Sequence, residues 1–570
     1  MSKHIHKLLA LLLAVVLVVS LAACAKTPAS STNTDSKSPS GDKYYNETGF
    51  PICKEPITIE VTGVTGNTLD WNKTRTVKNI EKIMGIKMNC TTYADAEIFN
   101  TKYAVMLTSN KLPDLFLQLD MDKTEINKNG DDGYLLNMMD YIDLMPNFKK
   151  FMDEHPDFAN YTKTSDGKIY SFNRCRDTWI SRAMSWTFAS NADLEKYSID
   201  MSKVKTVDDF YQVLKKVKEA DPNRVPFSLT FGGESGQRVD WMFKAAFGIN
   251  TVKFVGGTGV DKDGKVFLYD ITDNYREYLK YMNKLYTEKL MDNDAFTQTT
   301  DEFRSKIKNG TTMFWGDWSG LNGALGISDK DTALKYYALA GLTSDVNKTP
   351  TYLYYPEYTS NARVWVSKDT KYPEAICRLL DYPWSEEGWM FFDCGIEGED
   401  FKYKKDSLGN DIVDSTLEGF WDSSKYKSSS EWKSQEVIIV NALQMQVTSF
   451  ANKLIDKATD EELQKMMDDP EHDYTNSAAL EIAIRRDTKE KAVSMPFLAY
   501  TGEEASKRAS ITTDMNNELK LAHAEFIRGD RDINSDADWD KYKKTIEGLG
   551  LADLLAIEQT AYERFIGSSK

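Results

Sequence analysis

Residues 57–64 read Ile-Thr-Ile-Glu-Val-Thr-Gly-Val, and the pattern that begins here predicts the fold. Apolar and polar residues alternate in this stretch, as in a half-buried strand. In 77–84 the apolar residues recur every three or four positions, as on one face of a helix, and 86–90 alternates again. A second helical stretch at 95–109 and the apolar run 115–117 follow. This order predicts a βαβαβ unit with a parallel sheet.

Ligands of parallel sheets bind beyond the carboxyl ends of the strands. In this unit those ends are the segments 64–70 and 118–120. We therefore expect part of a binding site at these two segments.

Further along the chain, turns and helices are marked by their end residues. Residues 259–265 have the glycine and lysine spacing of a phosphate loop, but Val266 stands where a magnesium-binding Ser or Thr belongs. We interpret this segment as a hairpin turn. Ser385 is typical of a helix N-cap and Gly395 of a helix end, and the apolar stripe at 515–526 predicts a core-facing helix.

The amino-terminal end has the features of a secretory signal. Lys3 and Lys7 precede the uncharged apolar run 8–19, which leads to Leu21-Ala22-Ala23-Cys24. This tetrapeptide resembles the bacterial lipobox, which implies cleavage before Cys24 and lipid on its thiol. An uncleaved membrane anchor is the alternative, but about 12 apolar residues fall short of the roughly 20 needed to span a bilayer. The following residues, up to 43, contain no aromatic side chain and predict a flexible tether.

Composition excludes several classes of function. The 570 residues carry a formal net charge of −16, which repels nucleic acid and anionic lipid surfaces. The mean hydropathy is −0.50, and no later segment is apolar enough to span, so we expect membrane attachment only through lipid on Cys24. The other cysteines are odd in number and lack a C-x-x-C pair, so we expect neither a disulfide framework nor a zinc site: Cys53, Cys90, Cys175, Cys377 and Cys394. No cofactor is expected.

Several short segments together resemble one family. In chain order they are Leu112-Pro113-Asp114-Leu115-Phe116, Asp166-Gly167-Lys168-Ile169-Tyr170, Tyr372-Pro373-Glu374-Ala375, Ser385-Glu386-Glu387-Gly388, Gly395-Ile396-Glu397-Gly398, Phe526-Ile527-Arg528-Gly529 and Gln559-Thr560-Ala561-Tyr562. In this order, behind a lipobox, they resemble the landmarks of the extracellular solute-binding lipoproteins of carbohydrate ABC importers, family 1 type. The large lipoproteins of Gram-positive bacteria are the most similar subgroup. The chain departs from the family at 191–199, which puts in doubt ligand contacts made from that helix start.

The resemblance implies an α/β fold of two lobes, periplasmic-binding-protein-like, with a hinge of two or three crossing strands, an interlobe cleft and a helix-rich carboxyl-terminal part. We expect a signal peptide at 1–23, the lipidated Cys24 and tether at 24–50, a first lobe at 51–172 and 311–366, and a second lobe at 173–310 and 367–570. The function implied is capture of a saccharide, expected to be an oligosaccharide, outside the cell and its delivery to the permease of an ABC importer. No catalysis is implied. We expect a monomer anchored on the outer face of the cell membrane.

Candidate ligand contacts follow from the chemistry of sugars, which bind flat aromatic faces and planar polar groups. Loops that carry both residue types supply the candidates Asp317, Trp318, Trp315, Trp179, Arg176, Trp241, Glu357 and Arg363. Asp317 and Trp318 rank first, because residues 309–314 predict a turn and a strand that deliver them. The opposing interpretation is that the tryptophans are core residues and the charged groups are ion-paired.

Two other functions stay open from the sequence. A glycoside hydrolase needs only two suitably spaced carboxylates, and the chain has 87 acidic residues. A receptor for a non-sugar solute on the same fold is the other alternative, since a fold does not determine its ligand.

Overall fold

The computed structural model describes residues 43–65, 69–176, 178–183, 186–231, 237–317, 320–326, 332, 334–358, 361–414, 424, 450–469 and 475–568. The chain divides into two units, Met1–Tyr44 and Tyr45–Lys570, and the elements below all belong to the second unit. Cys24 and Trp318 lie outside the described residues.

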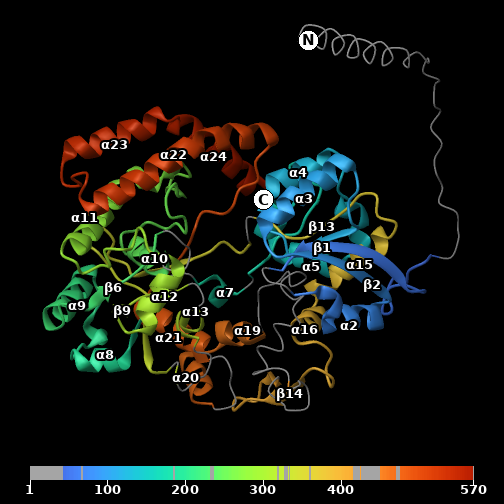
Figure 1. The fold of residues 1–570 in the computed structure, drawn as a ribbon, viewed down its shortest axis with the longest axis horizontal. Coiled ribbons are helices and arrows are strands. Elements are labelled where there is room, and N and C mark those ends of the chain that lie inside the picture. The colour runs from blue at the N-terminus through green and yellow to red at the C-terminus, as the bar shows by residue number, and fades with distance from the viewer. Residues whose placement is uncertain are drawn as a thin grey trace, which may run out of the picture. The chain divides into compact units, whose positions relative to one another are not determined.

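The predicted βαβαβ unit is confirmed (Figure 1). Strands β1 (Ile57–Val64), β2 (Ile86–Tyr93) and β3 (Leu115–Leu117) pair in parallel, with β1 between the other two. They are linked by helices α2 (Arg75–Met84) and α3 (Ala96–Ser109). Strand β13 (Trp365–Val366) joins β3 antiparallel and completes the order β13-β3-β1-β2. Ring stacking of Phe116 on Trp365, with centroids 5.3 Å apart, contributes to the core of this sheet.

Further elements pack against this sheet or lie beside it. They are β4 (Met121–Asp122), α4 (Lys123–Asp131), η2 (Met138–Leu144), α5 (Pro146–Glu154), α6 (Pro156–Thr162), β12 (Asn361–Ala362), α15 (Pro373–Asp381), η5 (Tyr382–Trp384), α16 (Glu386–Cys394), β14 (Lys402–Lys405) and β15 (Asp411–Asp414). The predicted cap is confirmed, because the Ser385 side chain accepts a hydrogen bond from the Gly388 amide and α16 ends at Gly395.

A second group of elements contributes to the main apolar core and to smaller clusters beside it. It comprises α7 (Trp179–Arg182), β5 (Thr187–Ser190), α8 (Asn191–Lys196), η3 (Met201–Lys203), α9 (Val207–Ala220), β6 (Val225–Phe227), α10 (Gln237–Ala246), β7 (Thr258–Val260), β8 (Val266–Leu268), η4 (Tyr269–Ile271), α11 (Asp273–Thr287), α12 (Thr300–Lys308), β9 (Thr312–Phe314), α13 (Gly320–Leu325), β10 (Tyr336–Leu339) and β11 (Thr351–Tyr354). The hairpin turn predicted at 259–265 is confirmed by the antiparallel pair β7 and β8.

The carboxyl-terminal part is mainly helical. Its elements are α19 (Phe450–Lys457), α20 (Asp460–Asp468), α21 (Thr475–Asp487), β16 (Glu490–Val493), α22 (Gly502–Arg528), α23 (Asp536–Gly548) and α24 (Leu551–Ser568). The apolar stripe of α22 is buried as predicted, and the helix ends at Gly529 in the left-handed conformation, with φ 84°. Within the described ranges, no helix is both long and apolar enough to cross a membrane.

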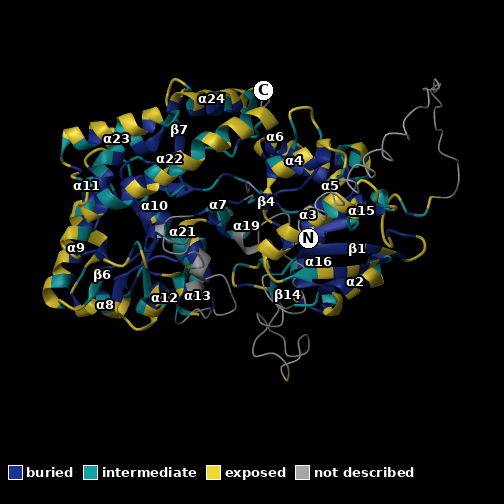
Figure 2. Ribbon diagram, turned by 45° about the horizontal axis from the view of Figure 1, so that its top comes forward, coloured by how far each residue is buried: buried dark blue, intermediate teal, exposed yellow. Residues whose placement is uncertain are grey.

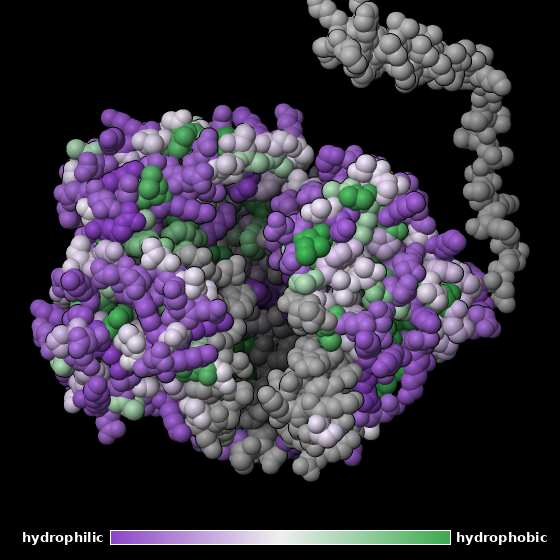
Figure 3. Space-filling view, viewed as in Figure 1, coloured by the Kyte–Doolittle hydropathy of each residue, from purple (hydrophilic) through white to green (hydrophobic). Residues whose placement is uncertain are grey.

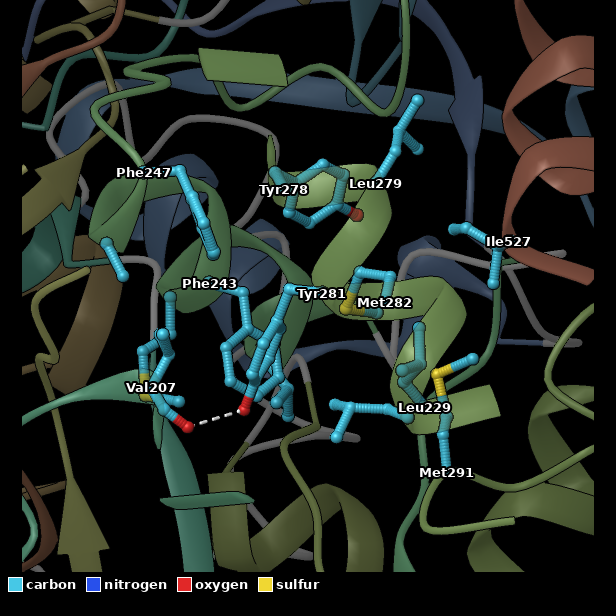
Figure 4. Packing of buried hydrophobic residues seen from close by; sticks show 14 of the residues in the cluster. Val207, Leu229, Phe243, Phe247, Tyr278, Leu279, Tyr281, Met282, Met291 and Ile527 are labelled. Atoms are coloured by element: carbon cyan, nitrogen blue, oxygen red, sulfur yellow. Dashed lines mark hydrogen bonds between the residues drawn. The ribbon is translucent and has the colours of Figure 1, made fainter. Parts of the chain in front are cut away.

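The main core joins segments that are far apart in the sequence (Figure 4). Phe243 of α10, Tyr278 of α11 and Ile527 of α22 all pack in it. The Tyr281 hydroxyl donates a hydrogen bond of 2.9 Å to the Val207 carbonyl within this core. Exposed residues lie on the outer faces of helices such as α9 and α23 (Figure 2). The contacts of Ile527 with this core hold helix α22 against the second group of elements.

Contacts group two segments differently from the lobe boundaries expected from the sequence. Strand β9 lies inside 311–366 but pairs in parallel with β6, and Phe314 packs in the main core. Helix α15 lies inside 367–570 but its Asp381 accepts a hydrogen bond of 2.8 Å from the Phe148 amide of α5. The physical reason is that apolar patterns predict strands and helices but not which distant sheet each element joins. The hinge positions themselves stay a prediction.

Candidate functional site

The two groups of elements are linked by paired chain segments. Antiparallel bridges join Phe172 to Val364, Cys175 to Tyr358 and Ala183 to Tyr354. The segment after β16 lies beside them, since the Tyr358 hydroxyl donates a hydrogen bond of 3.0 Å to the Phe497 carbonyl. In Figure 3 the surface is hollowed between the two groups. The crossing segments thus offer the backbone connections that a hinge requires.

Three cavities adjoin these segments, and each is named here by one lining residue. The Trp241 cavity has about 330 Å³, the Glu357 cavity about 430 Å³ and the Lys123 cavity about 550 Å³. All three volumes lie in the range of about 300 to 1,000 Å³ that is usual for small-molecule sites.

The Trp241 cavity combines aromatic and planar polar groups. Trp241 of α10 and Tyr355 meet edge to face, with ring centroids 6.1 Å apart. Gln237 and Asn516 also line this cavity and supply amide groups. The guanidinium carbon of Arg176 lies 4.9 Å from the centroid of the Tyr355 ring. Such an arrangement suits a sugar, whose C–H face stacks on a ring while its hydroxyls pair with polar groups.

The structure brings four of the predicted site residues into or beside the crossing segments. The Arg176 amide donates a hydrogen bond of 2.5 Å to the Glu357 carbonyl, and the Arg363 amide donates one of 2.9 Å to the Phe172 carbonyl. Trp241 lies beside the crossing segments because its ring contacts the Tyr355 ring edge to face. The Glu357 carboxylate is hydrogen-bonded to Nδ1 of His155.

Three other predicted residues lie in well-packed surroundings, and of these Trp179 belongs to a crossing segment and meets the Tyr354 ring edge to face. Asp317 is fully buried, and its carboxylate receives hydrogen bonds of 3.0 and 3.1 Å from Arg304. Trp315 is 2% exposed and packs in a small cluster with Phe303. Trp179 is half-buried, with the Lys491 ammonium 4.3 Å from its ring centroid. The ligand roles predicted for these residues stay predictions.

Arginines are concentrated at the crossing segments. Burial, with added repulsion from Arg363 and Arg176, lowers the pKa of Arg174 to about 9. Burial also lowers the pKa of Arg176, Arg182 and Arg363. Arg363 forms an ion pair with Asp120, in which a guanidinium nitrogen and a carboxylate oxygen are 3.7 Å apart. Positive charge is thus gathered here on a chain whose net charge is −16.

The Lys123 cavity contains a feature that the sequence analysis missed. Lys123 begins α4 and is 4% exposed, and its burial lowers its pKa to about 7. Only its position in the chain could have suggested Lys123 as a site residue, because it lies just beyond the segment 118–120 at the carboxyl end of β3, where a site was expected. Nothing in the local sequence indicates that this lysine is buried, since only the packing of distant elements covers it.

One group of three side chains in the described part of the chain has suitable atoms for a metal ion. The ligand atoms of His155, Cys175 and Glu357 all lie within 4.8 Å of one another. Arg176 and Arg182 are close enough to Cys175 for charge on its sulfur to affect their pKa values. These two guanidinium groups oppose a cation at this position.

Comparison with known proteins supplies the family. Residues 84–388 match the family model described as bacterial extracellular solute-binding protein. The fructooligosaccharide ABC transporter substrate-binding protein FusA of Streptococcus pneumoniae serotype 4 is 26% identical over 578 residues, covering 97% of each chain. A polygalacturonan/rhamnogalacturonan-binding protein, YtcQ of Bacillus subtilis, is 26% identical over 222 residues, covering 39% of this chain and 42% of that protein.

The fold has a similar solved relative. The structure of FusA in complex with kestose covers 90% of this chain and 100% of its own, with a TM-score of 0.68 at 22% identity. The two-lobed α/β fold expected from the sequence is therefore confirmed.

Proposed function

Because the chain belongs to the family of bacterial extracellular solute-binding proteins, we propose that it captures an oligosaccharide and delivers it to the permease of an ABC importer. The observation that carries the proposal is similarity to an oligosaccharide receptor over 97% of both chains. The family consists of binding proteins, so the chain is a receptor and the glycoside hydrolase alternative is set aside.

The crossing segments are the proposed place of capture. Half-buried Tyr355 and the largely buried Trp241 line one cavity with aromatic rings, Glu357 lines the neighbouring cavity, and the Arg176 guanidinium lies against Tyr355. Segments that link two lobes are close to both of them, so a ligand here contacts both lobes on closure.

The amino terminus supports attachment to the outer face of the cell membrane. The lipobox-like Leu21-Ala22-Ala23-Cys24 follows an apolar signal, and the residues up to 43 have the composition of a tether. In this proposal lipid on Cys24 holds a monomeric receptor near its permease.

Calorimetric titration of the full chain with kestose, longer fructo-oligosaccharides and acidic oligosaccharides tests the proposal. Tyr355→Ala should weaken binding about tenfold, or about 1.4 kcal/mol, because a stacking face and the surface under Arg176 are lost. Tyr403→Ala is the matched control, because Tyr403 lies on β14 and is 40% exposed. Failure of every saccharide to bind, while a non-sugar solute does bind, would contradict the proposal.

A further inference from the structure

The Lys123 cavity lies between elements of both groups. Lys123 of α4 and Tyr161 of α6 line it from the group around the sheet, and Thr258 of β7 lines it from the second group. Arg508 of α22 and Glu558 of α24 line it from the carboxyl-terminal helices that pack on the second group. Helix α22 contacts α4, and α24 contacts α6. A molecule in this cavity therefore touches both groups of elements at once.

Lys123 is buried without a carboxylate partner among the described residues. Its ammonium donates one hydrogen bond of 2.9 Å, to the Thr162 carbonyl, and lies 5.5 Å from the centroid of the Tyr161 ring. An ammonium has three donors, and burial of a charge is costly unless an opposite charge or full hydrogen bonding compensates it. The packing thus leaves a desolvated cation beside a cavity of about 550 Å³.

A structural role explains only part of this arrangement. Thr162 ends α6, and a cation at a helix carboxyl terminus is favourable because the last carbonyls lack helical partners. That role uses one of the three donors. It does not explain why a second lysine, Lys253, lines the same cavity.

The acidic groups of the cavity wall are already occupied. Glu558 accepts hydrogen bonds of 2.7 Å from Arg508 and 2.8 Å from the Tyr500 hydroxyl. Asp122 caps α4 by accepting from backbone amides, the closest at 2.8 Å. Among the described residues neither Lys123 nor Lys253 forms an ion pair, although the Glu558 charge acts on Lys253 and opposes the lowering of its pKa by burial. The wall therefore has cationic groups in excess.

We infer that the Lys123 cavity binds a carboxylate-bearing sugar residue of the captured saccharide, with the carboxylate held by Lys123 and Lys253. This inference rests on the proposed function and names the class of ligand. Half-buried Phe497 and Tyr500 line the same cavity and suit the apolar face of a sugar ring. A free inorganic anion has the same charge but no ring to stack on these side chains.

The test compares trigalacturonate with its full methyl ester, which has the same rings without the charges. Calorimetric titration of the full chain should give an affinity for the acid roughly 10- to 100-fold above that for the ester, since hydrogen bonds to charged groups are stronger. Lys123→Met should reduce the preference to about threefold or less, and Lys253→Met should reduce it in part. Kestose and inorganic phosphate are titrated alongside.

Matched variants separate binding from folding. Lys262→Met removes the same charge from the exposed β7–β8 turn and should keep the full preference for the acid. Should Lys123→Met fold poorly, Lys253→Met tests the same preference at the second lysine of the cavity.

The outcomes distinguish this inference from the function on which it rests. Equal affinity for acid and ester, or binding of kestose alone, overturns the inference and leaves the oligosaccharide receptor in place. Binding of phosphate as tight as that of trigalacturonate, lost in Lys123→Met, identifies a site for free anions and also overturns it. If no saccharide binds at all, the proposed function fails and the inference fails with it.

Discussion

Individual charged side chains differ most from what their local sequence indicates. Lys123 is an ordinary polar residue in the sequence, yet it is buried with a pKa of about 7. Asp317 follows a strand as an exposed loop residue would, yet its carboxylate is fully buried against Arg304. In both cases distant residues determine the surroundings of the charge.

Lys123→Met should change the pH dependence of stability. In the folded chain the Lys123 pKa is about 7, below the value of about 10.4 for an unfolded lysine, so between these values only the unfolded chain holds this proton. Raising the pH from 7 to 10 should therefore stabilise the wild type relative to the variant, by up to about 1.4 kcal/mol per pH unit. Denaturant unfolding at several pH values measures this, with Lys262→Met as control. A difference that is constant with pH would contradict it.

Asp317→Ala should destabilise the protein by about 2 to 3 kcal/mol, because it leaves the Arg304 guanidinium, whose side chain is 28% exposed, without its carboxylate. Asp301→Ala removes an acid that raises the Arg304 pKa only as the weakest of the named causes, and its effect should be smaller. Thermal unfolding of both variants measures the difference. Titration of the same proteins with saccharide tests the ligand role predicted for Asp317.

Among the helices and strands, local patterns proved reliable. The alternation in 57–64 became β1, and the three- and four-residue repeats of 77–84 and 515–526 became buried faces of α2 and α22. Local pattern predicts an element well because backbone geometry alone sets its period. It carries no information on long-range partners such as β6 for β9.

Helix α4 depends on a glycine that contacts an aromatic ring. A Cβ added to Gly130 would lie 2.2 Å from the Cγ atom of Tyr170, too close for the ring to remain in place. Gly130→Ala should therefore destabilise the protein by about 1 to 3 kcal/mol despite the better helix propensity of alanine. Gly502→Ala in α22, where no heavy atom lies within 4 Å of the added Cβ, should be neutral or stabilising. Equal melting temperatures for the two variants would argue against this packing.

In the molecule as a whole, a few crossing segments join two regions, and the proposed ligand contacts both of them. The bridges from Phe172 to Val364 and from Ala183 to Tyr354 tie these regions together. A ligand that contacts both regions shifts the equilibrium toward a closed form, because only that form offers all of its contacts.

Ligand should reduce the radius of gyration of the chain. The empty receptor is expected to be mainly open and the saturated receptor closed. Small-angle scattering with and without saturating saccharide measures the change, and a sugar that does not bind is the control. An unchanged radius at saturation would indicate a rigid binding platform.

Cys24→Ser should release a folded protein from the membrane, because the proposed lipid is attached only to that thiol and the folded unit begins at Tyr45, inside the tether expected at 24–50. Cell fractionation after a high-salt wash measures this. Cys53→Ser, a change at a buried cysteine of the folded body, should leave the attachment intact. Retention of the Cys24→Ser protein with the membrane would contradict the anchor.

Whereas the two-lobed fold was implied by the family resemblance, periodic apolar patterns and turn residues were enough to predict the βαβαβ unit and the hairpin turn at 259–265. These features depend on neighbours within a few residues, and local backbone geometry controls such neighbours. The surroundings of Lys123, the Asp317–Arg304 pair and the approach of Trp241 to Tyr355 were decided only by tertiary structure. Each of these brings together residues from separate elements, and solvent exposure and charge are set by that packing and not by residue type.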